Sequence, residues 1–298
     1  MKFGVNTFIW SGGFGPREFE LLPKIKDAGF DGVEIPVFAP SSVNAAAARR
    51  AIESAGLECT VCSVLTEGLS LISDDMGARR RALTRVREMI ATCAELGARL
   101  MAGPLYCPVG YLPGRRRNAN EWSRAIEAWQ NLSEALEANG VTAAIEPLNR
   151  FETFFLNTAS DVARLCEAVG HPRVGILFDT FHANIEEKSI ADGYRKCGRH
   201  LKHVHTCEND RGIPGSGHVE WAEVFRALRE LNYDGWLTIE SFGFNIVEIA
   251  AAAAIWRDIE ATPDSIAFEG LKFLKANASA TNAAHGLRSA AAKTEMPG

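Results

Sequence analysis

Short apolar segments of β character alternate with amphipathic helical segments from one end of the chain to the other. The helical segments, such as 78–96 and 121–138, carry apolar residues at the spacing of a helix face. Glycine often stands where a helix gives way to a strand, as in DAGFDGVEI and ANGVTAAI, and it favours the left-handed backbone of a helix end. The predicted strands are residues 2–8, 32–35, 58–64, 100–102, 141–145, 174–178, 201–204 and 236–239.

Eight strand–helix units within about 250 residues predict an α/β fold with a single (β/α)8 barrel, the TIM barrel. Several strands, such as VGILF at 174–178, are almost wholly apolar, as expected for a parallel sheet that is covered on both faces. The main alternative is a doubly wound open sheet, but the SGGFG after the first strand lacks the G-x-G-x-x-G spacing of such folds. We expect a barrel domain over residues 1–276. The Ala- and Ser-rich tail, 277–298, is expected to be flexible or packed at a subunit interface.

The composition excludes several classes of protein. A net charge of −5 over 298 residues argues against a partner that is a nucleic acid. No apolar run reaches the roughly 18 residues of a membrane span, and MKFGVNTFIW does not resemble a secretion signal. The seven cysteines are scattered and odd in number, which favours free thiols and a cytoplasmic location, with the C-x-x-C at Cys59 and Cys62 interpreted as buried apolar residues.

Four successive strands in the second half of the chain end in an ionisable residue. These residues are Glu146, Asp179, His205 and Glu240, and the barrel would bring all four to the C-terminal rim of adjacent strands. Three carboxylates and one imidazole would repel one another there unless a cation lay between them. Carboxylate oxygens with a histidine nitrogen suit a divalent ion, for which we predict Mn²⁺, with Co²⁺ or Mg²⁺ as alternatives and Zn²⁺ less favoured.

Polar residues on the loops behind this rim are candidates for binding substrate hydroxyls: Glu152, His182 and Arg211. Each of them, taken alone, could equally be a loop salt bridge. His203 either supports the site or is an ordinary core histidine. The long segment 103–120 is expected to lie at the catalytic face, with its three consecutive arginines solvated. Phe8, Trp10 and Phe242 are interpreted as apolar walls or as barrel packing.

Four motifs resemble those of the sugar 3-epimerases, the D-tagatose, D-allulose and L-ribulose 3-epimerase group of the xylose-isomerase-like barrels. They are IEPLNRFET, FDTFHANIEE, HVHTCENDRGIPGSGHVEW and TIESFG, and the resemblance extends from Met1 to about Lys275. It implies metal ligation by Glu146, Asp179, His205 and Glu240, and substrate contacts from Glu152, His182 and Arg211. Members of this family often have an aromatic pair where this chain has Asn6 and Thr7. Because that region lines the pocket, Asn6 is a further candidate substrate contact.

The predicted reaction is metal-dependent epimerisation at C3 of a free ketose such as D-tagatose, D-fructose, D-allulose or L-ribulose. Loss of the C3 proton, which is α to the C2 carbonyl, gives an enediolate, and Glu146 and Glu240 would exchange the proton on opposite faces of the sugar. The nearest alternatives are an aldose–ketose isomerase, a hydroxypyruvate isomerase or an inosose dehydratase. More distant ones are an endonuclease-IV-like nuclease, which needs a multi-metal cluster and a basic groove, and a non-catalytic sugar-binding barrel. A homodimer or homotetramer is expected.

Overall fold

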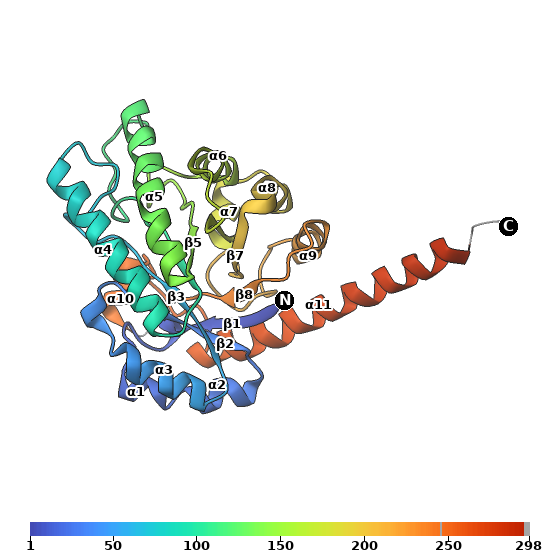
Figure 1. Ribbon diagram of the computed structural model, residues 1–298. Helices are drawn as coiled ribbons and strands as arrows, with labels where there is room; N and C mark the ends of the chain where they lie inside the picture. Colours follow the sequence, from blue (N-terminus) through green and yellow to red (C-terminus); the bar gives the residue numbers. More distant parts are fainter. Residues whose placement is uncertain (245, 295–298) are drawn as a thin grey trace.

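The computed structural model describes residues 1–244 and 246–294. Its centre is a closed barrel of eight parallel strands in sequence order, which confirms the predicted fold and excludes the open sheet (Figure 1). Each strand lies within a few residues of its predicted bounds. The strands are β1 (Lys2–Asn6), β2 (Gly32–Pro36), β3 (Glu58–Cys62), β4 (Leu100–Gly103), β5 (Thr142–Ile145), β6 (Val174–Asp179), β7 (Leu201–His205) and β8 (Trp236–Ile239).

Helices surround the barrel (Figure 1). The longest one before the C-terminal helix, α5, has a capping box in which Asn118 and Glu121 bond each other's backbone N–H groups, and it ends at Gly140 with φ 63°. The helices are α1 (Pro16–Phe19), α2 (Leu22–Ala28), α3 (Ala45–Ser54), α4 (Met76–Glu95), α5 (Ala119–Asn139), α6 (Ala159–Val169), α7 (Thr180–Glu186), α8 (Ile190–Cys197), α9 (Trp221–Glu230), α10 (Val247–Ala252) and α11 (Pro263–Thr294). Three short 3-10 helices are η1 (Thr7–Ile9), η2 (Pro40–Ser42) and η3 (Gly198–His200).

Side chains alternate along each strand between the helix-facing side and the barrel interior. The helix-facing residues, such as Val33, Val61 and Ile176, belong to one large apolar core. The interior has two unlike halves. Toward β4, β5 and β6 it is filled by a small apolar cluster of Leu100, Ala102, Ala144 and Leu177. Toward the other strands it holds the buried polar side chains of Asn6, Glu34, Thr60, His203 and Thr238.

Parallel pairing brings the predicted site residues to one rim. Asp179 pairs with His205, and His205 pairs in turn with Thr238, two residues before Glu240. At the end of β4, Gly103 has φ 133°, and a Cβ on it would meet the carbonyl oxygen of Ser63 at 2.1 Å. Only glycine therefore lets the loops after β3 and β4 approach this closely beside the site.

The C-terminal helix begins at Pro263 and packs first on α9, β8 and η1. It continues to Thr294, and its later part projects away from the barrel (Figure 1). The predicted boundary between barrel and tail at 276/277 thus falls inside one helix, and the last four residues of that tail lie outside the described residues. The proposed flexibility or subunit packing of 277–298 stays a prediction. Among the helices of the described part of the chain, none combines the length and the apolar character that a membrane crossing requires.

Candidate active site

The four predicted metal ligands meet at the C-terminal rim of β5 to β8. One ligand atom from each of Glu146, Asp179, His205 and Glu240 lies within 4.8 Å of the others, and all four residues are buried. From His205 Nδ1 the nearest carboxylate oxygens are those of Glu240 at 3.2 Å, Asp179 at 3.8 Å and Glu146 at 4.0 Å. We refer to these four residues as the quartet.

Two atoms of the quartet indicate that its residues fit a bound cation. Both His205 Nδ1 and Glu146 Oε1 are buried and have no hydrogen-bond partner among the described residues. Buried polar atoms are rarely left without a partner, and these two, a nitrogen and an oxygen of the kinds that bind metal ions, lie 4.0 Å apart. Three carboxylates and one imidazole are the ligand types that Mn²⁺ and related divalent ions accept.

The charge balance within the quartet is uneven. Burial, followed by the negative charge of Glu240, raises the pKa of Glu146 well above its usual range. Burial also opposes ionisation of Asp179, but the Arg211 guanidinium outweighs it and holds the pKa of that carboxyl below its usual range. Burial lowers the pKa of His205, yet the carboxylates of Glu240 and Glu34 outweigh burial and raise it. The site therefore favours added positive charge.

Arg211 connects the quartet to the loop between β7 and α9. Its Nη1 donates to Asp179 Oδ2 at 2.7 Å and to Glu240 Oε2 at 2.9 Å, and its guanidinium stacks over the ring of Phe181 at 4.1 Å. The backbone of Arg211 has φ 69°, an unusual conformation for a residue with a side chain. The fully buried Glu208 holds this loop, because it accepts hydrogen bonds from four N–H groups: those of Asn209, Gly215, Val219 and the Trp221 indole.

His182, on α7, is held as a neutral donor. Burial lowers its pKa to about 3, so the ring is uncharged at neutral pH. The backbone N–H of Asn149 donates to its Nδ1 at 3.2 Å, so the ring proton lies on Nε2. That Nε2 lies 3.3 Å from Arg211 Nη2 and 3.7 Å from Glu146 Oε1. Two donors thus converge at one point beside the quartet.

The quartet lies beneath a cavity of about 450 Å³ at the catalytic face. Glu152, His182 and Arg211 line this cavity, together with Glu146, His205 and Glu240. Burial raises the pKa of Glu152, whose carboxylate accepts from Asn149 Nδ2 at 2.7 Å. Asp179 and Asn6 are not among the residues that line it. Much of the remaining wall is apolar and is formed by Phe8, Phe38, Val109, Leu148, Phe242 and Ile249.

The other aromatic and loop predictions have mixed outcomes. Phe8 and Phe242 form the cavity wall, whereas Trp10 packs on Phe268 and donates its indole N–H to Asp264. The segment 103–120 contributes Gly103, Pro104 and Val109 to the cavity, as expected for a loop at this face. Its arginines are not simply solvated, because Arg115 pairs with Glu121 and Arg117 with Asp161. All seven cysteines are free, as predicted.

Asn6 lies in the interior below the cavity and is fully buried. Its side-chain N–H group donates to Glu34 at 3.1 Å and to Glu240 at 3.4 Å, while its oxygen accepts from the backbone of Phe8. Glu34 was not predicted as a site residue, although its carboxylate in the middle of the otherwise apolar strand GVEIP is a signal that the sequence contains. The structure favours a supporting role for His203, because its ring bonds Glu34 at 2.8 Å.

A closed barrel with converging ligand side chains under a cavity at its C-terminal rim is the architecture of a barrel enzyme for a small polar substrate. Residues 22–277 of this chain match the family of xylose isomerase-like TIM barrels. A probable ketose 3-epimerase of Synechocystis sp. is 38% identical over 275 residues, which cover 92% of this chain and 96% of that protein. An L-ribulose 3-epimerase of Mesorhizobium japonicum is 31% identical over 276 residues, which cover 92% and 93%.

A crystal structure of D-allulose 3-epimerase from Methylomonas sp. in complex with D-allulose has a TM-score of 0.88 at 26% identity, with coverage of 93% of this chain and 97% of that one. The chain belongs to the family of xylose isomerase-like TIM barrels. The resemblance to sugar 3-epimerases is therefore confirmed, and with it the predicted class of enzyme, an isomerase acting on carbohydrates.

Proposed function

We propose that this protein epimerises free ketoses at C3, with D-tagatose, D-fructose, D-allulose and L-ribulose as candidate substrates. The observation that carries this assignment is that two glutamates of the quartet line one cavity. Glu146 and Glu240 end the outer strands of the quartet, β5 and β8, and both line the cavity. Inversion at C3 requires a proton to leave one face of the sugar and another to arrive on the opposite face, which needs two such groups.

The chain's own residues suit the remaining tasks. His182 Nε2 and Arg211 Nη2 lie 3.3 Å apart, and both are donors, so a ketose oxygen between them would satisfy both. Glu152 lines the same cavity and would accept from a sugar hydroxyl. Asn6, predicted as a substrate contact, is proposed to act through Glu240 instead, since its amide bonds that carboxylate below the cavity.

We propose that the quartet binds a divalent cation, with Mn²⁺ preferred. Such an ion would polarise the ketose carbonyl and stabilise the negative charge that develops when the C3 proton leaves. The residues that would hold it are Glu146, Asp179, His205 and Glu240. A homodimer or homotetramer and a cytoplasmic location remain predictions.

The proposal is tested by incubating Mn²⁺-loaded protein with D-fructose, D-tagatose or L-ribulose in D₂O and separating the sugars by chromatography. We expect the C3 epimer of at least one sugar, with deuterium at C3 alone. Deuterium at C1 with an aldose product would instead assign an aldose–ketose isomerase. Nicking of abasic duplex DNA would assign the nuclease, although Arg211 is the one arginine or lysine among the described residues that line the cavity. Sugar binding without exchange would assign a binding protein.

Replacing Arg211 with alanine is expected to raise KM by about ten- to a hundredfold, because a hydrogen bond from a charged donor to the sugar is lost. Mn²⁺ affinity should stay the same or rise, since a positive charge 2.7 Å from Asp179 is removed. Steady-state kinetics and Mn²⁺ titration measure the two effects. Arg211→Gly is the control for backbone strain at φ 69°, and its KM should be raised as much as that of Arg211→Ala. An unchanged KM in both variants would contradict the assigned role.

A further inference from the structure

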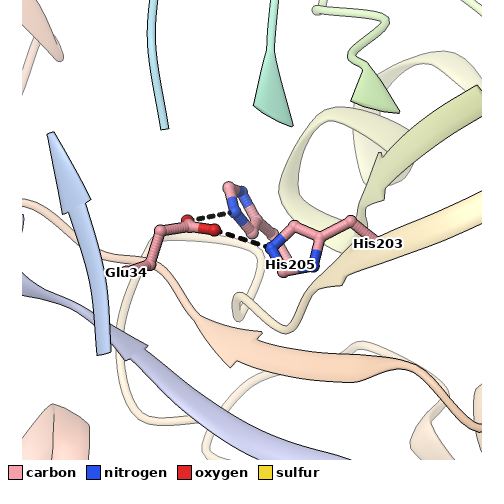
Figure 2. Close-up of side chains that lie close together, drawn as sticks. All are labelled: Glu34, His203 and His205. Atoms are coloured by element: carbon pink, nitrogen blue, oxygen red, sulfur yellow. Dashed lines mark hydrogen bonds and ion pairs between the residues drawn. The ribbon is translucent and has the colours of Figure 1, made fainter. Parts of the chain in front are cut away.

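A buried glutamate in the barrel interior carries a network of its own below the quartet. Glu34, on β2, is fully buried and lies across the interior from β7, with β1 and β8 between the two strands. Figure 2 shows its carboxylate directed at the rings of His203 and His205. His205 is the histidine of the quartet, so this carboxylate contacts the proposed metal site from behind.

Both oxygens of Glu34 are fully engaged. Oε1 accepts from His205 Nε2 at 2.7 Å and from Asn6 Nδ2 at 3.1 Å. Oε2 accepts from His203 Nε2 at 2.8 Å and from Thr60 Oγ1 at 2.9 Å. A carboxylate has about four lone-pair directions, and four donors occupy them here.

Glu34, His203 and His205 also place potential metal-ligating atoms within 4.8 Å of one another. The contacts nevertheless identify Glu34 as a hydrogen-bond acceptor and not as a metal ligand. The nitrogen–oxygen distances of 2.7 and 2.8 Å are those of hydrogen bonds. Two ligands bound to one ion at about 2.0–2.1 Å in a tetrahedral site would lie more than about 3 Å apart. The carboxylate also has no lone pair left for an ion.

We propose that Glu34 is a positioning residue that fixes the ring orientation and tautomer of His205, so that Nδ1 presents its lone pair to the quartet. As a metal ligand the His205 imidazole is neutral, with one N–H and one lone pair, and a carboxylate at Nε2 can only accept, so the proton lies on Nε2. Nδ1, which has no hydrogen-bond partner among the described residues, then faces Glu240 at 3.2 Å. A carboxylate behind a histidine ligand also makes the ligand more basic.

The same contacts give Asn6 and His203 a place in this arrangement. The Asn6 amide spans Glu34 and Glu240, so it ties the positioning carboxylate to a quartet carboxylate. His203 bonds the oxygen of Glu34 that His205 does not use. His203 therefore holds Glu34 in place through Oε2 and leaves Oε1 to His205.

This inference rests on the proposed metal site, and Mn²⁺ affinity measured by titration calorimetry tests it apart from turnover. Glu34→Met keeps the volume of the side chain but removes the acceptor, and we expect it to weaken Mn²⁺ binding about ten- to a hundredfold. His203→Leu disturbs the same buried cluster but leaves His205 its acceptor, so Mn²⁺ affinity should change less than about threefold. A structural role alone would lower the melting temperature of both variants and leave both affinities near that of the parent protein.

A second measurement uses the unaltered protein and needs no variant to fold. In Zn²⁺-loaded protein labelled with ¹⁵N-histidine, NMR should show His205 with its proton on Nε2, hydrogen-bonded and slow to exchange, and with Nδ1 bound to the metal. A proton on Nδ1, or a metal on Nε2, would overturn the inference. So would a folded Glu34→Met protein that binds Mn²⁺ within threefold of the parent. Failure of the parent protein to bind Mn²⁺ would overturn this inference together with the metal site, whereas the other outcomes affect the inference alone.

Discussion

Glu146→Gln and Glu240→Gln are each expected to lower kcat for C3 epimerisation by about 10²- to 10⁴-fold, the range that a lost general acid–base group produces. An amide of the same shape neither takes up nor delivers the proton. Both residues line the cavity, from the two ends of the quartet. Glu248→Gln is a matched control, because this residue also lines the cavity but lies on α10 outside the quartet, and its kcat should stay near that of the parent.

Proton exchange separates the roles of the two glutamates. If each serves one face of the sugar, a variant that cannot complete epimerisation should still exchange the C3 proton of one epimer with solvent. The two variants should then exchange opposite epimers, which NMR in D₂O can follow with D-fructose and D-allulose supplied separately at saturating Mn²⁺. Near-normal turnover in either variant would remove that residue from the mechanism. Exchange of the same epimer by both variants would contradict the two-face arrangement.

Removal of divalent ions with a chelator is expected to abolish epimerisation and to lower the melting temperature by about 10 °C. At an ion concentration about 1,000 times Kd, binding contributes about 4 kcal/mol to stability, and each kcal/mol shifts the melting temperature of a chain this large by roughly 2–4 °C. Without an ion, the three buried carboxylates of the quartet lie close together, and Arg211 pairs with two of them, Asp179 and Glu240. Calorimetric scans with and without Mn²⁺ measure the difference.

The stabilisation by Mn²⁺ should decrease as the pH falls, because protons compete with the ion for the same ligands. The pKa of Glu146 is raised by burial, so this competition should begin at a higher pH than for an ordinary carboxylate. Asp179→Asn is the control and should lose most of the Mn²⁺-dependent gain at every pH. An equal melting temperature with and without Mn²⁺ between pH 5 and 8 would contradict the metal site.

The strand pattern could be predicted from sequence because it arises locally. Apolar β-branched segments, glycine at helix ends and caps such as Asn118 act within a few residues of one another. The quartet could be predicted for a related reason. Glu146, Asp179, His205 and Glu240 occupy equivalent positions in successive units, and a parallel barrel places equivalent positions side by side.

Arg211 and His182 could be predicted from the sequence as candidate substrate contacts, but the contacts that orient their side chains could not. The orientation of Arg211 depends on a loop held by Glu208 through N–H groups as far along the chain as Trp221. The tautomer of His182 depends on a backbone N–H that is 33 residues away in sequence. Such contacts form between the loops of different strand–helix units. The repeated unit predicts which strands are neighbours, but it does not predict which loop residues meet.

The barrel, the rim at which the ionisable residues gather and the kinds of ligand they offer could all be predicted from the amino-acid sequence, because each depends on local periodicity and on a repeated unit. Which interior residue lies behind which ligand could not be predicted, because it depends on how distant strands meet in the closed barrel. Glu34 lies 169 residues from His203 and 171 from His205, and closure of the barrel brings them to within 2.8 Å. Contacts across the interior depend on the stagger of strands around the closed barrel, a property of the whole fold that no segment of the chain carries.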